Sequence, residues 1–193
     1  MGVFWNFIYD AGKICDKYIF KFPLRRSNSD ELALREARIV SVFQKISPIY
    51  IPPVEIFYHR GRVIRRYEFV HGTQLRQMPV DVALANIDKM APQIAKFMFD
   101  VGCADPSEIR DLKPKARTRP KYMYGWSQGD ICDNFFVDME TMKIIAFIDW
   151  EDCVFGDFSG VFTSDRRSPH RELMAAVRAE YDRLYADKTN WHY

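Results

Sequence analysis

Three side chains with oxygen donors stand at the ends of two short apolar segments in the second half of the sequence. Asp130 and Asn134 precede the apolar stretch 135–138, and Asp149 directly follows the apolar stretch 143–148. Both stretches are rich in β-branched and aromatic residues, so we expect two strands joined by a tight turn that brings their outer ends together. Two carboxylates and an amide oxygen form a hard-oxygen donor set, which suits Mg²⁺. The sequence therefore predicts that Asp130, Asn134 and Asp149 converge on one site.

A lysine and a glutamate in the first half form a second pair of candidate residues. Lys21 lies in the segment 18–22, whose alternating aromatic residues predict a strand, and Glu36 interrupts an apolar stripe of helical spacing between Leu32 and Phe43. A charged side chain that is buried alone costs several kcal/mol, so each of the two needs a partner. We expect them to pair with one another, and a lysine held in this way can bind nucleotide phosphates.

Each of these residues also has an ordinary structural explanation. Asp130 or Asn134 alone could cap a loop, and Asp149 alone could be the N-cap of a helix. Lys21 and Glu36 could form a salt bridge with a purely structural role. Their joint order along a strand, a helix and a hairpin favours the functional interpretation.

The remaining pattern predicts an α+β fold. The expected strands are 3–9, 14–22, 54–59, 63–70, 135–138 and 143–148. The segment 10–13 has turn chemistry and is expected to connect the first two strands. Apolar residues at helical spacing over 84–98 predict one long helix that Pro92 kinks, and a last helix is expected over 169–186.

Composition and charge exclude several classes of function. The 28 basic and 26 acidic residues nearly cancel, and a net charge of +2 gives no basis for binding nucleic acid. The four cysteines form no C-x-x-C pair and the four histidines are scattered, so no zinc site is expected. The sequence has neither a signal-peptide pattern nor an apolar stretch near the ~18 residues that span a bilayer, so we expect a cytoplasmic protein without membrane contact. The aromatic share of 15% predicts a core built on large rings.

The candidate residues belong to longer runs that form a recognisable set. These runs are 18–23, 35–38, 67–75, 128–134, 148–152 and 156–157. The last three are similar to the pattern His-Gly-Asp, Asn, Ile-Asp-Trp-Glu and Gly-Asp of the aminoglycoside phosphotransferase-like and choline kinase-like family. The chain therefore resembles a shortened member of that branch of the protein-kinase-like fold. The resemblance implies two lobes: a small antiparallel-sheet N-lobe with one helix over residues 1–71, and a mainly helical, truncated C-lobe over residues 72–193.

The resemblance also implies roles for the candidates in the C-lobe. Asp130 would be the catalytic base, which accepts or orients the proton of a substrate hydroxyl. Asn134 and Asp149 would hold Mg²⁺. The reaction would be in-line transfer of the γ-phosphoryl group of ATP.

In the N-lobe, the resemblance implies a binding site for the rest of the nucleotide. Lys21 would contact the α- and β-phosphates, and Glu36 would fix Lys21. Glu68, Phe69 and Val70 would meet the adenine through backbone groups.

Three departures from the family pattern stand out. Gln128 occupies the position of the usual histidine, Asp130 and Asn134 are four positions apart where the family has five, and Val161 stands where a further aspartate is expected. The helical region that builds the acceptor pocket is reduced to about one helix, so a protein partner is a candidate for completing the acceptor site.

Three functions follow from these observations. The first is a kinase acting on a small-molecule hydroxyl, the second is a minimal protein kinase with a protein acceptor, and the third is a nucleotide-binding pseudokinase or scaffold without turnover. An acidic lining from Asp133, Glu151, Asp152 or Asp157 would favour a cationic acceptor such as an aminosugar.

Overall fold

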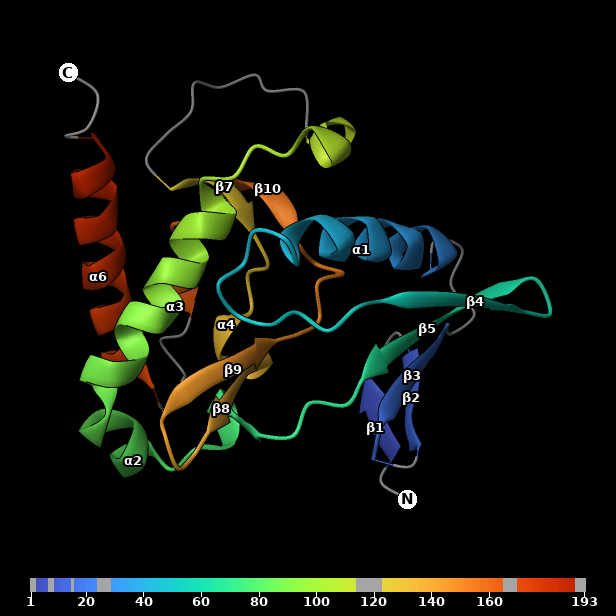
Figure 1. The fold of residues 1–193 in the computed structure, drawn as a ribbon, viewed down its shortest axis with the longest axis horizontal. Helices are drawn as coiled ribbons and strands as arrows, with labels where there is room; N and C mark the ends of the chain where they lie inside the picture. The colour runs from blue at the N-terminus through green and yellow to red at the C-terminus, as the bar shows by residue number, and fades with distance from the viewer. Residues whose placement is uncertain are drawn as a thin grey trace.

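Two groups of elements, joined by a short connecting segment, make up the computed structural model (Figure 1). The structure describes residues 3–6, 9–14, 16–23, 29–113, 123–164 and 170–189. A five-stranded sheet with one helix forms the first group, and helices with two smaller sheets form the second. This is the two-lobed α+β architecture that the sequence predicts. The division into domains at residues 71 and 72 falls in the connecting segment and stays a prediction.

The large sheet is antiparallel throughout and brings two cationic residues together. Its strands are β1 (Val3–Asn6), β2 (Tyr9–Ile14), β3 (Tyr18–Pro23), β4 (Glu55–His59) and β5 (Arg62–Glu68). They lie in the order β1-β2-β3-β5-β4. Lys21 on β3 is directly opposite Arg65 on β5. Residues that face each other on adjacent strands project from the same side of a sheet, so the two cations are close neighbours.

The beginning of the sheet differs from the prediction. The segment 10–13, which was expected to be a turn, lies inside β2. β2 pairs with β1 on one side and with β3 on the other. The turn before β3 includes Asp16, whose φ is 52°. Pairing on both sides of β2 therefore outweighs the local turn preference of Asp10 and Gly12, because strand formation depends on its neighbours more than on intrinsic propensity.

Helix α1 (Ser29–Phe43) lies between the large sheet and the second group of elements (Figure 1). Its buried residues include Ala33, Ile39, Val40 and Phe43, at the spacing of one helical face. Glu36 lies among them and is 0% exposed. The structure therefore confirms the prediction that a carboxylate interrupts the apolar face of this helix.

The second group contains the helices and two small sheets. Its elements are β6 (Thr73–Gln74), η1 (Leu75–Gln77), α2 (Val80–Ala85), α3 (Ile87–Gly102), η2 (Ser107–Leu112), β7 (Tyr124–Ser127), α4 (Ile131–Asn134), β8 (Phe135–Asp138), β9 (Lys143–Phe147), β10 (Val154–Asp157), α5 (Val161–Ser164) and α6 (Arg171–Thr189). The predicted hairpin appears as β8 and β9, which form a sheet with β6, while β7 pairs with β10. α6 packs along α3, as the buried residues Leu173, Val177 and Tyr181 require. No helix among the described residues has the length and apolar character needed to cross a membrane.

The long helix expected over residues 84–98 is in fact two helices. α2 ends at Ala85 and α3 begins at Ile87. Between them, the side-chain Nδ2 of Asn86 donates to the Val82 carbonyl oxygen at 2.9 Å, which closes the end of α2. The break therefore falls at Asn86, and Pro92 lies within α3.

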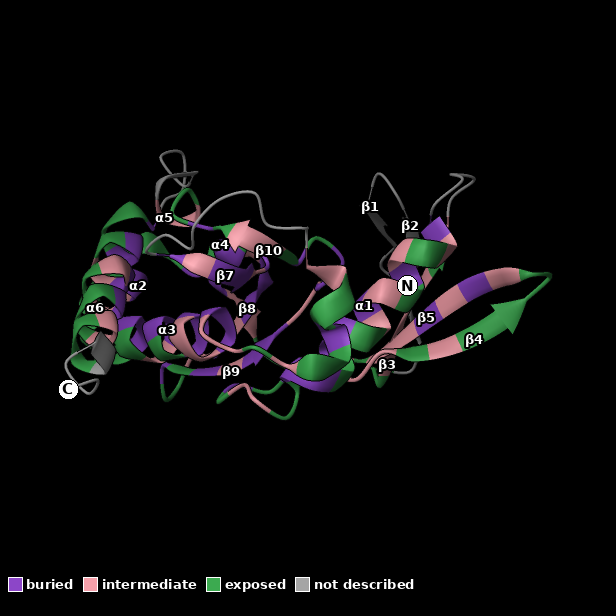
Figure 2. Cartoon of the chain, turned by 90° about the horizontal axis from the view of Figure 1, so that it is seen from above, coloured by how far each residue is buried: buried purple, intermediate pink, exposed green. Residues whose placement is uncertain are grey.

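A single core of aromatic rings joins α1 to the second group. Phe43 of α1 stacks on Trp150 with ring centroids 5.3 Å apart, and Phe147 meets the same indole edge-on at 5.4 Å. Phe97 of α3 contacts Trp150 at 6.0 Å. Figure 2 shows buried residues along α1, α3 and β9, whereas β4 is largely exposed. The prediction of a core built on large rings is confirmed, and Trp150 contacts three of these rings.

β7 packs closely against the end of α3, and this contact can be tested by substitution. A Cβ atom added to Gly125 of β7 would lie 1.9 Å from the backbone oxygen of Gly102, at the end of α3. We expect Gly125→Ala to lower the free energy of unfolding by ~3 kcal/mol, because backbone on both sides must move. Urea unfolding measures this loss.

Gly156→Ala is a matched control for this substitution. Gly156 pairs directly with Gly125 across β7 and β10, and an added Cβ there meets nothing within 4 Å. We expect this variant to stay within about 0.5 kcal/mol of the wild type. Equal losses in the two variants would contradict the packing of β7 on α3.

Candidate active site

Asp149 follows β9, and both polar atoms of the peptide group that follows it are hydrogen-bonded. Its φ is 62°, in the left-handed region that residues other than glycine seldom adopt. Its carbonyl oxygen accepts a hydrogen bond from Nε2 of Gln128 at 2.8 Å. The next backbone amide, that of Trp150, donates to Oε1 of Glu36 at 3.1 Å. An uncommon backbone conformation persists only where its surroundings hold it, and here α1 and the segment before α4 do so.

The four positions from Asp130 to Asn134 form one turn of helix, α4. The side-chain Nδ2 of Asn134 donates to the Asp130 carbonyl oxygen at 2.9 Å. The backbone oxygen of Asn134 accepts from the Ile148 amide at 3.0 Å, which places Asn134 beside the residue that precedes Asp149. The shorter spacing is thus accommodated by a helical turn, and Oδ1 of Asn134 accepts no hydrogen bond from the residues that the structure describes.

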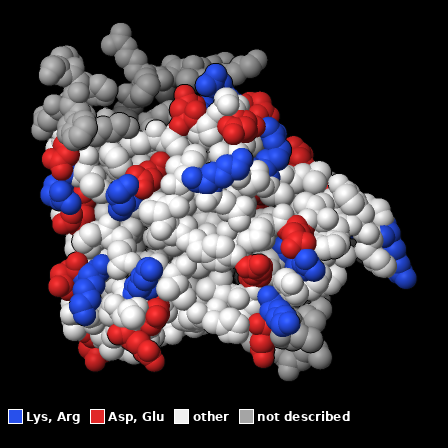
Figure 3. Space-filling model, in the orientation of Figure 1, with Lys and Arg blue, Asp and Glu red and all other residues white. Residues whose placement is uncertain are grey.

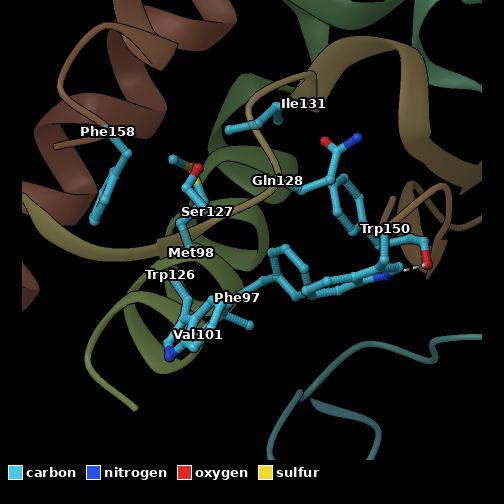
Figure 4. A pocket seen from close by; sticks show the side chains of 10 residues that line it. Phe97, Met98, Val101, Trp126, Ser127, Gln128, Ile131, Trp150 and Phe158 are labelled. Atoms are coloured by element: carbon cyan, nitrogen blue, oxygen red, sulfur yellow. Dashed lines mark hydrogen bonds between the residues drawn. The ribbon is translucent and has the colours of Figure 1, made fainter. Parts of the chain in front are cut away.

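Gln128 connects the two aspartates. Its Oε1 accepts from the Asp130 amide at 2.9 Å, while its Nε2 donates to the Asp149 carbonyl oxygen. The side chain is buried and lies at the edge of a small apolar cavity that Trp126 and Trp150 also line (Figure 4). Sequence reasoning noted Gln128 only as a replacement for histidine and missed this bridge. The bridge could have been expected from the residue type, because an amide side chain carries both a donor and an acceptor and can therefore link two backbone groups.

Lys21 contacts Asp149, which corrects the expected pairing with Glu36. Its Nζ lies 2.6 Å from Oδ1 of Asp149, and the ammonium lies 5.4 Å from the centre of the Tyr67 ring. Burial lowers the pKa of Lys21, but the negative charges of Asp149 and Glu36 outweigh this effect, so the pKa is raised overall. Lys21 therefore remains a cation at neutral pH.

Glu36 is held by three other donors. It accepts hydrogen bonds from Nη1 of Arg65, from the Tyr67 hydroxyl at 2.6 Å and from the Trp150 amide. The direct Lys21–Glu36 pair does not form because Arg65, opposite Lys21 in the sheet, takes its place.

Arg65 and Tyr67 are site residues that sequence reasoning missed. Val63 and Arg65 are 4% and 0% exposed, so Arg65 occupies the buried face of β5. The signal that could have revealed it is the one that revealed Glu36, a charged residue on a face whose neighbour is apolar. Glu151 is the second carboxylate on Arg65, at 2.8 Å, and its burial raises the pKa of the Glu151 carboxyl although Lys21 and Arg65 oppose the shift.

Five of the site residues predicted from the sequence line a cleft between the large sheet and the β8–β9 hairpin. It has a volume of about 90 Å³, and its lining includes Lys21, Glu68, Phe69, Val70 and Asp149. The amide of Phe69 already donates to the Lys17 carbonyl oxygen at 2.7 Å, so a ligand must use other backbone groups of this segment.

The other three predicted residues do not line this cleft. Glu36 is hydrogen-bonded to Tyr67, which lines the cleft. Asp130 is connected to Asp149 through Gln128, and Asn134 is connected to Ile148 through the Ile148 amide.

The Gln128 bridge makes a testable prediction. We expect Gln128→Leu to lower the free energy of unfolding by ~2 kcal/mol, because the Asp130 amide and the Asp149 carbonyl lose their shared partner. Gln44→Leu is the control, since the side chain of exposed Gln44 makes one hydrogen bond to the described residues, to the Ile51 carbonyl. A loss for Gln128→Leu no larger than that for Gln44→Leu, measured by urea unfolding, would show that the bridge contributes nothing.

Comparison with known proteins identifies the fold. No family model and no curated protein sequence matches this chain. Solved structures do. The GDP complex of aminoglycoside 2'-phosphotransferase-IIIa matches with a TM-score of 0.77 and 16% identity over 93% of this chain and 75% of that chain. The apoenzyme of macrolide 2'-phosphotransferase MphH from Brachybacterium faecium matches with a TM-score of 0.66 and 12% identity over 92% and 74%.

A third solved structure agrees with these two. The ADP-bound aminoglycoside phosphotransferase APH(2'')-Ib matches with a TM-score of 0.65 and 14% identity over 93% of this chain and 76% of that chain. The chain therefore has the kinase-like fold of the aminoglycoside and macrolide phosphotransferases, as the resemblance in its sequence predicts.

Proposed function

We propose that this chain is an ATP- and Mg²⁺-dependent phosphotransferase that acts on a hydroxyl group of a small molecule. The observation that carries the proposal is the contact between Lys21 and Asp149 in the wall of a cleft, with Gln128 linking Asp149 to Asp130. Solved structures of this fold include a GDP complex, an ADP-bound protein and a streptomycin–ATP ternary complex, which supports a nucleotide as the ligand of the cleft.

In the proposed complex, the nucleotide extends along the cleft. The base lies at Glu68, Phe69 and Val70 and uses their backbone groups other than the Phe69 amide. The phosphates lie at Lys21, whose ammonium is already beside Asp149. Lys21 then exchanges its hydrogen bond to Asp149 for one to phosphate, a charge-assisted contact of similar strength.

The residues that would hold Mg²⁺ are Asp149 and Asn134. Both offer oxygen, the donor that Mg²⁺ prefers, and Nδ2 of Asn134 is occupied by the Asp130 carbonyl, so Oδ1 is the atom left to face a cation. Oδ2 of Asp149 accepts no hydrogen bond from the residues that the structure describes. When bound, Mg²⁺ would neutralise negative charge on the phosphates.

In the proposed function, Asp130 is the residue that acts on the acceptor. Asp130 is exposed, and its backbone amide donates a hydrogen bond to the Gln128 side chain. In the proposed reaction the Asp130 carboxylate accepts the proton of the acceptor hydroxyl, the hydroxyl oxygen forms a bond to the γ-phosphorus, and the bond from that phosphorus to the bridging oxygen of ADP breaks. Lys21 supplies positive charge beside the phosphates, and the rigid loop supplies orientation.

The structure narrows the acidic lining suggested by the sequence. Glu151 is buried against Arg65 and is not available to an acceptor. Asp133 forms a surface ion pair with Arg76 at 3.0 Å. On the face shown in Figure 3, positive and negative side chains are interspersed. Glu151 therefore cannot contribute to an acidic lining of the acceptor site. A preference for a cationic acceptor then depends on Asp133, Asp152 and Asp157.

The first test is turnover of ATP against a panel of hydroxylated acceptors. The panel includes aminoglycosides, macrolides, choline and a protein such as casein, with and without Mg²⁺. We expect ADP release with a small-molecule acceptor, and a loss of at least ~100-fold for Asp130→Asn, which cannot accept the proton. Asp111→Asn is the matched control, because Asp111 forms an exposed pair with Arg38 away from the cleft.

Each other outcome of the panel has a defined meaning. Unchanged turnover in Asp130→Asn contradicts the role of Asp130, and phosphorylation of the protein alone favours the protein-kinase alternative. ATP that stabilises the chain by ~2.7 kcal/mol at 100 times its dissociation constant, without turnover of any acceptor, favours the pseudokinase alternative.

A further inference from the structure

Arg65 is a buried arginine to which the proposed reaction assigns no role. Its side chain is 1% exposed, and its Nη1 donates both to Oε2 of Glu36 and to Oε2 of Glu151. The side chains of the two glutamates are 0% and 6% exposed. Removing an ion from water costs several kcal/mol, so three buried charges are tolerated only when they are paired with one another.

The two carboxylates on Arg65 come from different parts of the chain. Glu36 lies on α1, and Glu151 lies two positions after Asp149. Arg65 itself lies on β5 of the large sheet. Its guanidinium therefore connects the sheet both to α1 and to the segment that follows Asp149, the candidate metal ligand.

Arg35, the neighbour of Glu36 on α1, holds the same segment from another side. Its guanidinium donates to the carbonyl oxygens of Glu151, at 3.1 Å, and Cys153. The chain after Asp149 is thus attached to α1 through backbone groups and to β5 through the Glu151 side chain. Arg65, which binds the Glu151 side chain, also binds Glu36 of α1.

Arg65 determines which partner is left for Lys21. The two cations face each other across β3 and β5, so they compete for the same carboxylates. Arg65 takes Glu36 and Glu151, and the Lys21 ammonium bonds to Asp149 at 2.6 Å. Both carboxylates are bound by the single atom Nη1, which lies one bond farther from the backbone than the Nζ of a lysine, so the guanidinium reaches between Glu36 and Glu151 while Lys21 stays beside Asp149.

We propose that Arg65 is a positioning residue for the Lys21–Asp149 pair. By holding Glu36 and Glu151 together, it fixes the chain after Asp149 and keeps Lys21 for Asp149 and the nucleotide phosphates. Without Arg65, Glu36 loses a donor, and Lys21, whose charge already interacts with Glu36, can take the place of Arg65. The consequence for catalysis rests on the proposed function, whereas the connection of β5 to Glu151 does not.

A double-mutant cycle tests that connection without any activity measurement. We expect Arg65→Met and Glu151→Gln each to lower the melting temperature by at least ~6 °C, because the first removes the cation that two buried carboxylates share and the second removes the charge of one of those carboxylates. The double variant should lose less than the sum of the two. Arg66→Met is the control. Arg66 lies next to Arg65 on β5 and pairs with Glu55 of β4 at the surface, so this variant should change the melting temperature little. Losses that add in full would overturn the proposal.

Arg65→Lys separates positioning from general stability. A lysine restores one positive charge, but its ammonium stops one bond short of the position of Nη1, the atom that bonds to both carboxylates. We expect this variant to recover most of the melting temperature lost in Arg65→Met while its kcat stays at least ~10-fold below the wild type, because Lys21 and Asp149 are misplaced. Assays are run well below every melting temperature. A kcat that returns in step with the melting temperature would show a merely structural role and overturn the proposal.

Failure of the proposed function gives a different result from failure of this inference. If the wild type turns over no acceptor, the proposed function fails, and the role of Arg65 is decided by the double-mutant cycle alone. If the wild type is active and the cycle shows no coupling between Arg65 and Glu151, the proposed function stands and the positioning role falls.

Discussion

The buried carboxylate of Glu36 is the interaction on which the candidate site depends. It receives hydrogen bonds from Arg65, Tyr67 and the backbone amide of Trp150, so one side chain of α1 joins β5 to the chain that follows β9. A carboxylate without partners in such a place would cost several kcal/mol, and three donors of this kind offset that cost. Because the third donor is a backbone amide, the carboxylate fixes the main chain one residue after Asp149.

The aromatic core reinforces the same point in the chain. Trp150 packs against Phe43 of α1 and Phe97 of α3, so its ring cannot shift without disturbing both parts of the molecule. Polar contacts on the backbone and apolar contacts on the ring therefore act on one residue. Asp149 keeps a left-handed backbone conformation next to this anchor, with its carboxylate directed to Lys21.

Much of this arrangement can be read from the sequence, and the part that cannot has a physical reason. Glu36 and Lys21 are recognisable because charged residues interrupt apolar or alternating patterns. Asp149 is recognisable because it ends an apolar strand. The exchange of partners between Lys21 and Arg65 is not recognisable, since it depends on strand register, which sets them opposite each other.

The errors in secondary structure have the same origin. The segment 10–13 has turn residues yet forms part of β2, because strands on both sides pair with it. The long helix divides at Asn86, where a side-chain hydrogen bond to Val82 ends α2, although Pro92 is the stronger helix breaker by propensity. Local propensity fails where tertiary pairing or a single side-chain contact decides the outcome.

We propose that Lys21, Asn134 and Asp149 form one site for a nucleotide with its metal ion. The most direct measurement is calorimetric titration of ATP, with and without Mg²⁺, into the wild type and Asp149→Asn. We expect Mg²⁺ to lower the dissociation constant of ATP for the wild type by at least ~10-fold, about 1.4 kcal/mol, and Asp149→Asn to remove this difference. Equal affinity with and without Mg²⁺ in the wild type, or a full Mg²⁺ effect in Asp149→Asn, would contradict it.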